Sequence, residues 1–178
     1  GTIYVAEGQE DQHSILKNEG KSKAFADFVH GLGWTVGGHS LFLAINTYSF
    51  QVDVATHRGF LGGLDKTNGT SGWTAPYWAN QTTEVIFHDV TRMPTKHNEP
   101  QQIHKVNTSP PPHTHPQYFF STLIEKAVGN DAVHIIWSEH KRDYDPTTIT
   151  SQFNDVHIII YPLSSGLFRI QIYQKENV

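Results

Sequence analysis

Apolar residues between Ser22 and Gly33 recur at spacings of one, three and four positions, which is typical of an amphipathic helix. Ser22 stands in front as a capping residue, and glycines follow at the other end. The pattern predicts one helix over Lys23–His30. Glycines then crowd residues 59–72, together with Thr, Asn and Ser, so we expect a loop system in which these glycines make backbone turns.

Three later segments are dense in β-branched and aromatic residues, namely Thr83–Thr91, Ala132–Ser138 and Val156–Tyr161. Their apolar side chains occupy consecutive positions, which predicts strands inside a sheet. Apolar and polar residues then alternate from Phe168 to Tyr173, which predicts a strand with one wet face in a hairpin with the strand before it. Few helices and several strands predict an α/β (α+β) fold with a mixed central β-sheet flanked by helices.

A chain of 178 residues is expected to form a single domain with a substantial core. Its 4 Trp, 7 Tyr and 10 Phe supply large side chains that disordered chains lack, and Trp34 and Trp137 are expected in the core. A formal net charge of -4 argues against binding to nucleic acid or to an anionic membrane. The longest apolar run, Leu41–Ile45, is far below the roughly 20 residues that span a bilayer. Without cysteine or a signal pattern, a cytoplasmic location is expected.

The 12 histidines raise the alternative of a metal enzyme. His113 and His115, with His97 and His104 nearby, fall in a proline-rich stretch that lacks the fixed ligand spacing of a metal site. A solvated loop is the simpler interpretation, and we expect no metal. The chain also contains no HExxH, GxSxG or GxxxxGK[ST] motif, so the usual zinc, serine and phosphate-loop chemistries lack their signatures.

Gly129, Asn130 and Asp131 come immediately before the strand predicted from Ala132. By residue type alone they predict a plain turn. The surrounding text VGNDAVHIIWSEHKRDY and TSQFNDVHIIIYPL closely resembles the Rap/Ran-type GTPase-activating domain shared by tuberin, the Rap GTPase-activating proteins and the Ral GTPase-activating complex. YVAEGQEDQHSIL, FADFVHGLGW and DVATHRGFLGGL match the same family, and the first of these is most similar to the catalytic α subunit of the Ral complex.

The resemblance implies that a Ras-family small GTPase is stimulated by an "asparagine thumb" from the GND motif, here Asn130. A carboxamide suits this task because its oxygen accepts a hydrogen bond from the attacking water and its nitrogen donates a hydrogen bond to the γ-phosphate. The chain would supply this residue in trans and have no independent enzymatic activity. It needs no cofactor, because GTP and magnesium are carried by the GTPase.

The resemblance also assigns residues around the thumb. Lys126 and Phe153 would contact the GTPase, Lys141 and Arg142 are candidate contacts, and Gly129 and Asp131 would support the turn. Ral is the first partner expected, with Rap and Rheb as alternatives, and a regulatory β subunit is a further partner. The family has a His where this chain has Ala127. A non-catalytic domain that binds a GTPase or a subunit therefore remains the alternative function.

Residues 36–51 and 106–126 interrupt both the predicted elements and the family text. Removal of either segment joins flanking sequence that matches the family. Each segment begins with Val, whose codons start with GT, and ends with Gln or Lys, whose codons can end in AG. These are the nucleotides found at the two ends of an intron. Two hypotheses stay open, translated in-frame introns or true insertions within one domain that spans 1–178.

Overall fold

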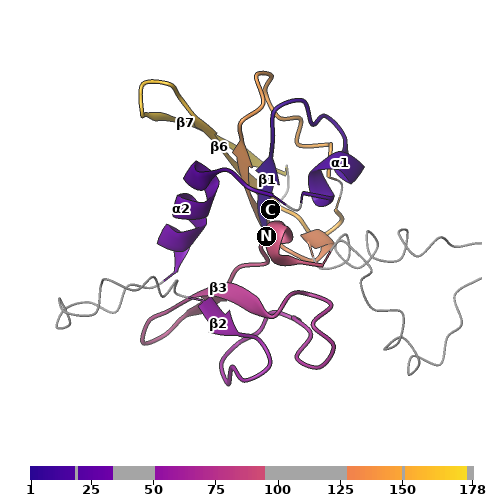
Figure 1. Ribbon diagram of the computed structural model, residues 1–178, viewed down its shortest axis with the longest axis vertical. Helices are drawn as coiled ribbons and strands as arrows, with labels where there is room; N and C mark the ends of the chain where they lie inside the picture. Colours follow the sequence, from indigo (N-terminus) through magenta and orange to yellow (C-terminus); the bar gives the residue numbers. More distant parts are fainter. Residues whose placement is uncertain (19, 34–50, 95–127, 150, 176–178) are drawn as a thin grey trace, which may run out of the picture.

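The computed structural model describes residues 1–18, 20–33, 51–94, 128–149 and 151–175, which form two β-sheets and a few short helices (Figure 1). The larger sheet has the order β1-β5-β6-β7 and consists of β1 (Thr2–Val5), β5 (Val133–Ser138), β6 (Val156–Pro162) and β7 (Phe168–Gln174). The smaller sheet consists of β2 (Gln51–Asp53), β3 (Thr74–Ala79) and β4 (Glu84–Ile86). The helices are α1 (Gln12–Leu16), α2 (Lys23–Leu32) and the 3-10 helix η1 (Val90–Arg92). The predicted fold class, a mixed sheet flanked by helices, is confirmed.

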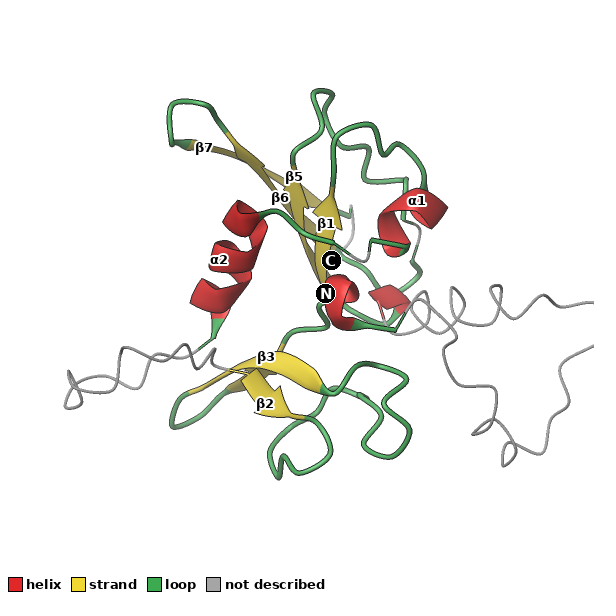
Figure 2. Ribbon diagram, viewed as in Figure 1, coloured by secondary structure: helices red, strands yellow, loops and turns green. Residues whose placement is uncertain are grey.

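The larger sheet is buried on both faces over its parallel part. β1, β5 and β6 run parallel, and β7 is added antiparallel to β6. Successive side chains of a strand point to opposite faces, so Ile136 and Trp137 belong to different hydrophobic clusters. Phe25 of α2 packs in the cluster with Trp137, whereas Ile15 of α1 packs in the cluster with Ile136 (Figure 2). Burial on two sides explains the nearly continuous apolar runs of β5 and β6.

Helix α2 begins at the predicted cap, because the Ser22 hydroxyl accepts a hydrogen bond of 3.0 Å from the backbone N–H of Phe25. The helix extends to Leu32, slightly farther than the apolar pattern indicates. Its inner face packs against Trp137, whose ring centroid lies 6.4 Å from that of Phe25. Trp137 is 2% exposed, so its predicted place in the core is confirmed. Trp34 lies outside the described residues.

The prediction of one internal strand over Thr83–Thr91 is wrong. Within this segment only β4 forms a strand, β4 lies at an edge of the smaller sheet, and η1 begins at Val90. Asp89 explains the break, because its carboxylate accepts hydrogen bonds from the Thr91 backbone N–H at 3.0 Å and from the Thr91 hydroxyl at 2.8 Å. These local bonds cap a tight turn that competes with the strand.

The predicted hairpin of β6 and β7 is confirmed by their antiparallel register. The apolar row of β7 is itself largely open to solvent, however, since Phe168 is 56% and Ile172 68% exposed. The sequence patterns missed β1, which is only four residues long, and β3, in which Pro76 interrupts the strand signature.

The suspected insertions lie outside the described residues except for Gln51, which opens β2 opposite Pro76. Their origin, and the single-domain boundaries of 1–178, therefore stay predictions. In the described part of the chain, every helix is too short or too polar to cross a membrane.

Candidate functional site

The GND motif forms an exposed turn at the point where the chain enters β5. Residues 128 and 129 have helical backbone, Asn130 lies in the turn that follows, and the strand begins at Val133. The Asp131 N–H donates a 3.1 Å hydrogen bond to the Val128 carbonyl and closes this turn. Asn130 is exposed, and no described residue hydrogen-bonds to its carboxamide. The turn therefore presents an amide group to whatever docks against it.

Three side chains hold the backbone of this turn by binding its carbonyl oxygens. The Ser151 hydroxyl donates to the Gly129 carbonyl, and Asn154 Nδ2 donates to the Asp131 carbonyl at 3.3 Å. His134 Nε2 lies 2.9 Å from the Val128 carbonyl oxygen, and because that oxygen can only accept, Nε2 carries the hydrogen. His134 and Asn154 are buried, at 0% and 1% exposed. These contacts fix the turn from the sheet side and leave its tip free.

Asp131 anchors the turn through its side chain. Its carboxylate oxygens lie 2.9 Å and 3.1 Å from His88 Nδ1, and one of them lies 2.9 Å from the Gly1 nitrogen. Burial alone would raise the pKa of the Asp131 carboxyl, but the hydrogen bond from His88 acts against it, and the pKa is lowered. Asp131 is therefore ionised at neutral pH. These contacts are the ones through which Asp131 would support the turn, and that role stays a prediction.

Phe153 lies in the neighbouring loop that leads into β6, and it is 61% exposed. Ser151 joins this loop to the Asn130 turn, because its hydroxyl binds the Gly129 carbonyl and also accepts a 3.1 Å hydrogen bond from the Phe153 N–H. Lys175 Nζ donates to the carbonyls of Ser151 and Gln152 at 3.1 Å and 3.2 Å. An exposed apolar ring and an exposed carboxamide are thus held on adjoining loops at one end of the sheet.

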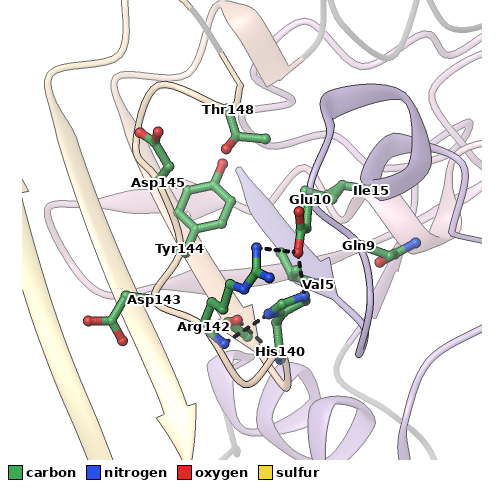
Figure 3. Close-up of a pocket in the computed structure, with 11 residues that line it drawn as sticks. Val5, Gln9, Glu10, Ile15, His140, Arg142, Asp143, Tyr144, Asp145 and Thr148 are labelled. Atoms are coloured by element: carbon green, nitrogen blue, oxygen red, sulfur yellow. Dashed lines mark hydrogen bonds and ion pairs between the residues drawn. The ribbon is translucent and has the colours of Figure 1, made fainter.

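Lys141 and Arg142 lie at the opposite end of β5, in the loop that follows the strand. Lys141 Nζ is 2.6 Å from a Glu7 oxygen, and Arg142 Nη1 is 2.9 Å from a Glu10 oxygen. Figure 3 shows Arg142 and His140 directed toward Glu10 across a pocket between the β1–α1 loop and the loop after β5. The structure therefore groups Gly129, Asn130, Asp131 and Phe153, and places Lys141 and Arg142 apart from them. Lys126 lies outside the described residues.

The described residues contain no group of three His, Cys, Asp or Glu side chains arranged to hold a metal ion. The histidines that raised the metal alternative, His97, His104, His113 and His115, are outside this part of the chain.

Comparison with known proteins identifies the family. The Rap/ran-GAP family model matches residues 45–108 and 112–178, which is more than half of the chain. The chain belongs to the Rap/ran-GAP family. This Rap/ran-GAP chain is 43% identical over 178 residues to Ral GTPase-activating protein subunit alpha-1 of Homo sapiens, with 99% of the chain but only 7% of the human protein covered. It is 32% identical to the tuberous sclerosis 2 protein homolog of Schizosaccharomyces pombe, over 95% of the chain and 10% of that protein.

The fold agrees with this assignment. A solved structure of the TSC2 GAP domain superposes with a TM-score of 0.75 at 24% sequence identity, covering 99% of this chain and 80% of that one. The resemblance inferred from the sequence blocks is thus confirmed for both the family and the fold. The Rap/ran-GAP chain spans only 7% of the length of the human Ral GTPase-activating subunit, so its activity and its partners are proposals.

Sequence analysis missed the residues that hold the Asn130 turn in this Rap/ran-GAP chain. His88 was read as part of a continuous strand, and Ser151 and Asn154 flank Phe153 without any local pattern of their own. The one sequence feature that could have indicated these residues is their polar character beside strands that are otherwise apolar. Such a signal shows that a partner is needed, but not which carbonyl or carboxylate provides it.

Proposed function

We propose that this chain is the part of a GTPase-activating protein that stimulates GTP hydrolysis by a Ras-family small GTPase, with Asn130 as its catalytic residue. The observation that carries the proposal is the Asn130 turn itself. An exposed carboxamide with no hydrogen bond to a described residue stands on a turn whose three carbonyls are bound by Ser151, His134 and Asn154. A side chain that is free at its tip and rigid at its base is suited to enter a partner's active site.

The chemistry follows from the two ends of the carboxamide. Asn130 Oδ1 would accept a hydrogen bond from the water that attacks the γ-phosphate, and Nδ2 would donate to a γ-phosphate oxygen. Phosphoryl transfer requires position and charge stabilisation more than covalent help from the protein, so one well-placed amide can contribute strongly. Phe153, on the adjoining loop, would bury its exposed ring against the GTPase and so contribute to binding.

The similarity to Ral GTPase-activating subunits supports Ral as the first GTPase to test, with Rap and Rheb as alternatives. GTP and magnesium would be brought by the GTPase, and this chain would contribute no cofactor. A cytoplasmic setting and a regulatory β subunit are part of the same proposal. Lys126, Lys141 and Arg142 remain candidate contacts; the last two would meet a GTPase only if it extends along β5, a strand of six residues and roughly 20 Å.

The deciding experiment is single-turnover GTP hydrolysis by Ral, Rap and Rheb, with and without this chain, together with the variant Asn130→Ala. Loss of the amide should lower the stimulated rate by about 10³-fold while binding of the GTPase is largely retained, because the interaction is made mainly in the transition state. Asn68→Ala, which removes another exposed asparagine from a turn, is the matched control and should keep full activity.

Two results would contradict the proposal. If Asn130→Ala stimulates hydrolysis as well as the unmodified chain does, Asn130 is not the catalytic residue. If the unmodified chain binds a GTPase without accelerating hydrolysis, the non-catalytic interaction domain becomes the better description, and the Ala127 position would then be the first to replace with His.

A further inference from the structure

His88 lies at a junction between the smaller sheet and the Asn130 turn. It lies two residues after the end of β4, is 6% exposed, and reaches Asp131 across 43 positions of sequence. Because the ionised carboxylate of Asp131 can only accept, His88 Nδ1 carries the hydrogen and donates it. A hydrogen bond to an ionised carboxylate is stronger than one between neutral groups.

The other edge of the His88 ring is confined by packing. Nε2 is buried and has no hydrogen-bond partner among the described residues. A Cβ atom on Gly62 would lie 3.1 Å from this nitrogen and 2.9 Å from a methyl carbon of Ile86, so the backbone of the loop before β3 passes close to the ring. Gly62 has φ of +57°, which a residue with a side chain adopts reluctantly. The ring is thus held between this loop and Asp131, with Nδ1 directed at the carboxylate.

Asp131 links the fixed His88 ring to the backbone next to Asn130. Its N–H binds the Val128 carbonyl, its own carbonyl accepts from Asn154, and its carboxylate is bound by His88. The direction in which the Asn130 side chain leaves the turn depends on the backbone torsions on either side of it. Without His88, the Asp131 side chain would lose its donor from the smaller sheet, and the turn could rotate toward other partners.

We propose that His88 is a positioning residue for Asn130, and that it acts through Asp131 to set the direction of the carboxamide without touching the GTPase. The proposal rests on the catalytic role assigned to Asn130 above. The smaller sheet would then contribute to the reaction indirectly, because β4 and the loop at Gly62 hold the histidine that positions the turn.

The test is a set of variants in the full chain, assayed for saturating rate and for apparent affinity toward the GTPase. His88→Ala should lower the saturating rate by about 10- to 100-fold and leave the apparent affinity within about twofold, since small misplacements of a catalytic group carry costs of that size. His88→Asn, whose amide nitrogen can occupy the place of Nδ1, should restore most of the rate. His88→Gln, whose amide reaches toward the place of Nε2, should not.

His57→Ala is the matched control. His57 Nε2 is also buried without a hydrogen-bond partner in the described part of the chain, and its ring packs against Tyr77 of the smaller sheet, 4.5 Å between centroids. It should keep the saturating rate of the folded fraction. A double variant, His88→Ala with Asp131→Ala, should be no slower than the slower single variant, because both changes remove the same interaction between His88 and Asp131.

The outcomes separate this inference from the proposed function. If Asn130→Ala is slow but His88→Ala keeps the full saturating rate, His88 is only structural and the inference is wrong. The same conclusion follows if His88→Asn and His88→Gln are equally impaired, a comparison that remains decisive when the Ala variant does not fold. If Asn130→Ala itself is fully active, the proposed function fails first, and no rate effect of His88 could then be assigned to Asn130.

Discussion

Strand β5 joins two loops that are held in opposite ways. The turn before the strand is bound by side chains that are buried and donate to its backbone carbonyls, with His134 and Asn154 almost without exposure. In the loop after the strand, Lys141 and Arg142 are instead held by exposed charges, as in the pair of Lys141 with Glu7, whose side chains are 84% and 64% exposed. One strand therefore separates an Asn130 turn that is held by buried hydrogen bonds from two cationic side chains that are held by exposed ion pairs.

The difference lies in what each bond replaces. A buried carbonyl that loses its donor finds no water, and the cost is about 1 to 3 kcal/mol. An exposed ion pair that breaks is replaced by hydration, so it contributes about 0 to 1 kcal/mol. A group that must be placed within fractions of an ångström belongs on the first kind of loop, and Asn130 is there. A loop of the second kind can exchange its partners when another protein approaches.

Acid should loosen the Asn130 end of the sheet before the other end. Burial lowers the pKa of His134 to about 4, and burial also lowers that of His157, whose ring centroid lies 5.4 Å away. The unfolded chain, with a histidine pKa of 6.5, binds more protons than the folded chain between pH 6.5 and 4. The contribution of neutral His134 to the free energy of unfolding should therefore be fully present above pH 6.5. The free energy of unfolding should fall by on the order of 3 kcal/mol from His134 alone as the pH drops to 4.

Chemical denaturation across this pH range measures the effect. His134→Gln keeps an amide donor for the Val128 carbonyl but cannot titrate, so its free energy of unfolding should depend less steeply on pH in the same window. Equal slopes for the two chains would show that protonation of His134 is not the cause.

Phe153→Ala should weaken binding of the GTPase without slowing the bound complex. The ring is 61% exposed in the free chain, and burial of a Phe side chain at an interface is worth roughly 1.5 to 3 kcal/mol, or about 10- to 100-fold in affinity. The measurement is the apparent affinity and the saturating rate in the hydrolysis assay. Phe60→Ala, which removes a phenylalanine that is 56% exposed in the loop after β2, is the control and should leave both values unchanged.

Ser151→Ala should affect both halves of the Asn130 end, because the Ser151 hydroxyl links the Gly129 carbonyl to the Phe153 loop. We expect a loss of about 1 kcal/mol in the free energy of unfolding and roughly a tenfold fall in the saturating rate. Ser165→Ala, in the exposed β6–β7 turn, should change neither quantity. A fall in stability without any change in rate would mean that the turn does not need this anchor for catalysis.

Glu10→Gln should have the smallest effect of the set. It removes the charge that pairs with Arg142 at 2.9 Å, and exposed pairs of this kind contribute less than about 1 kcal/mol to the free energy of unfolding. Thermal or chemical denaturation at low and high salt is the measurement, and the small difference should vanish at high salt. A loss of several kcal/mol would show that the two ends of β5 are held by comparable forces.

Local patterns were sufficient for the elements whose local preferences agree with their burial. The helix from Ser22 and the strands from Val133 and Val156 were predictable, because apolar periodicity and a capping residue act over a few positions. The segment Thr83–Thr91 was misjudged, since Asp89 binds Thr91 and ends the strand with contacts that β propensity does not include. Asn130 became a candidate catalytic residue only because the sequence around it resembles the Rap/Ran-type GTPase-activating domain.

The amino-acid sequence by itself determined that this chain has a mixed sheet, a helix against it, and an exposed Asn130 turn in front of a buried strand. Only the tertiary structure decided what holds that turn, because His88 approaches it from the segment after β4, and Ser151 and Asn154 approach it from the loop before β6. It also decided that Lys141 and Arg142 pair with Glu7 and Glu10, which follow β1 in the sequence. The physical reason is that periodicity reports which residues face the core, whereas hydrogen bonds between distant residues depend on how the two sheets are brought together.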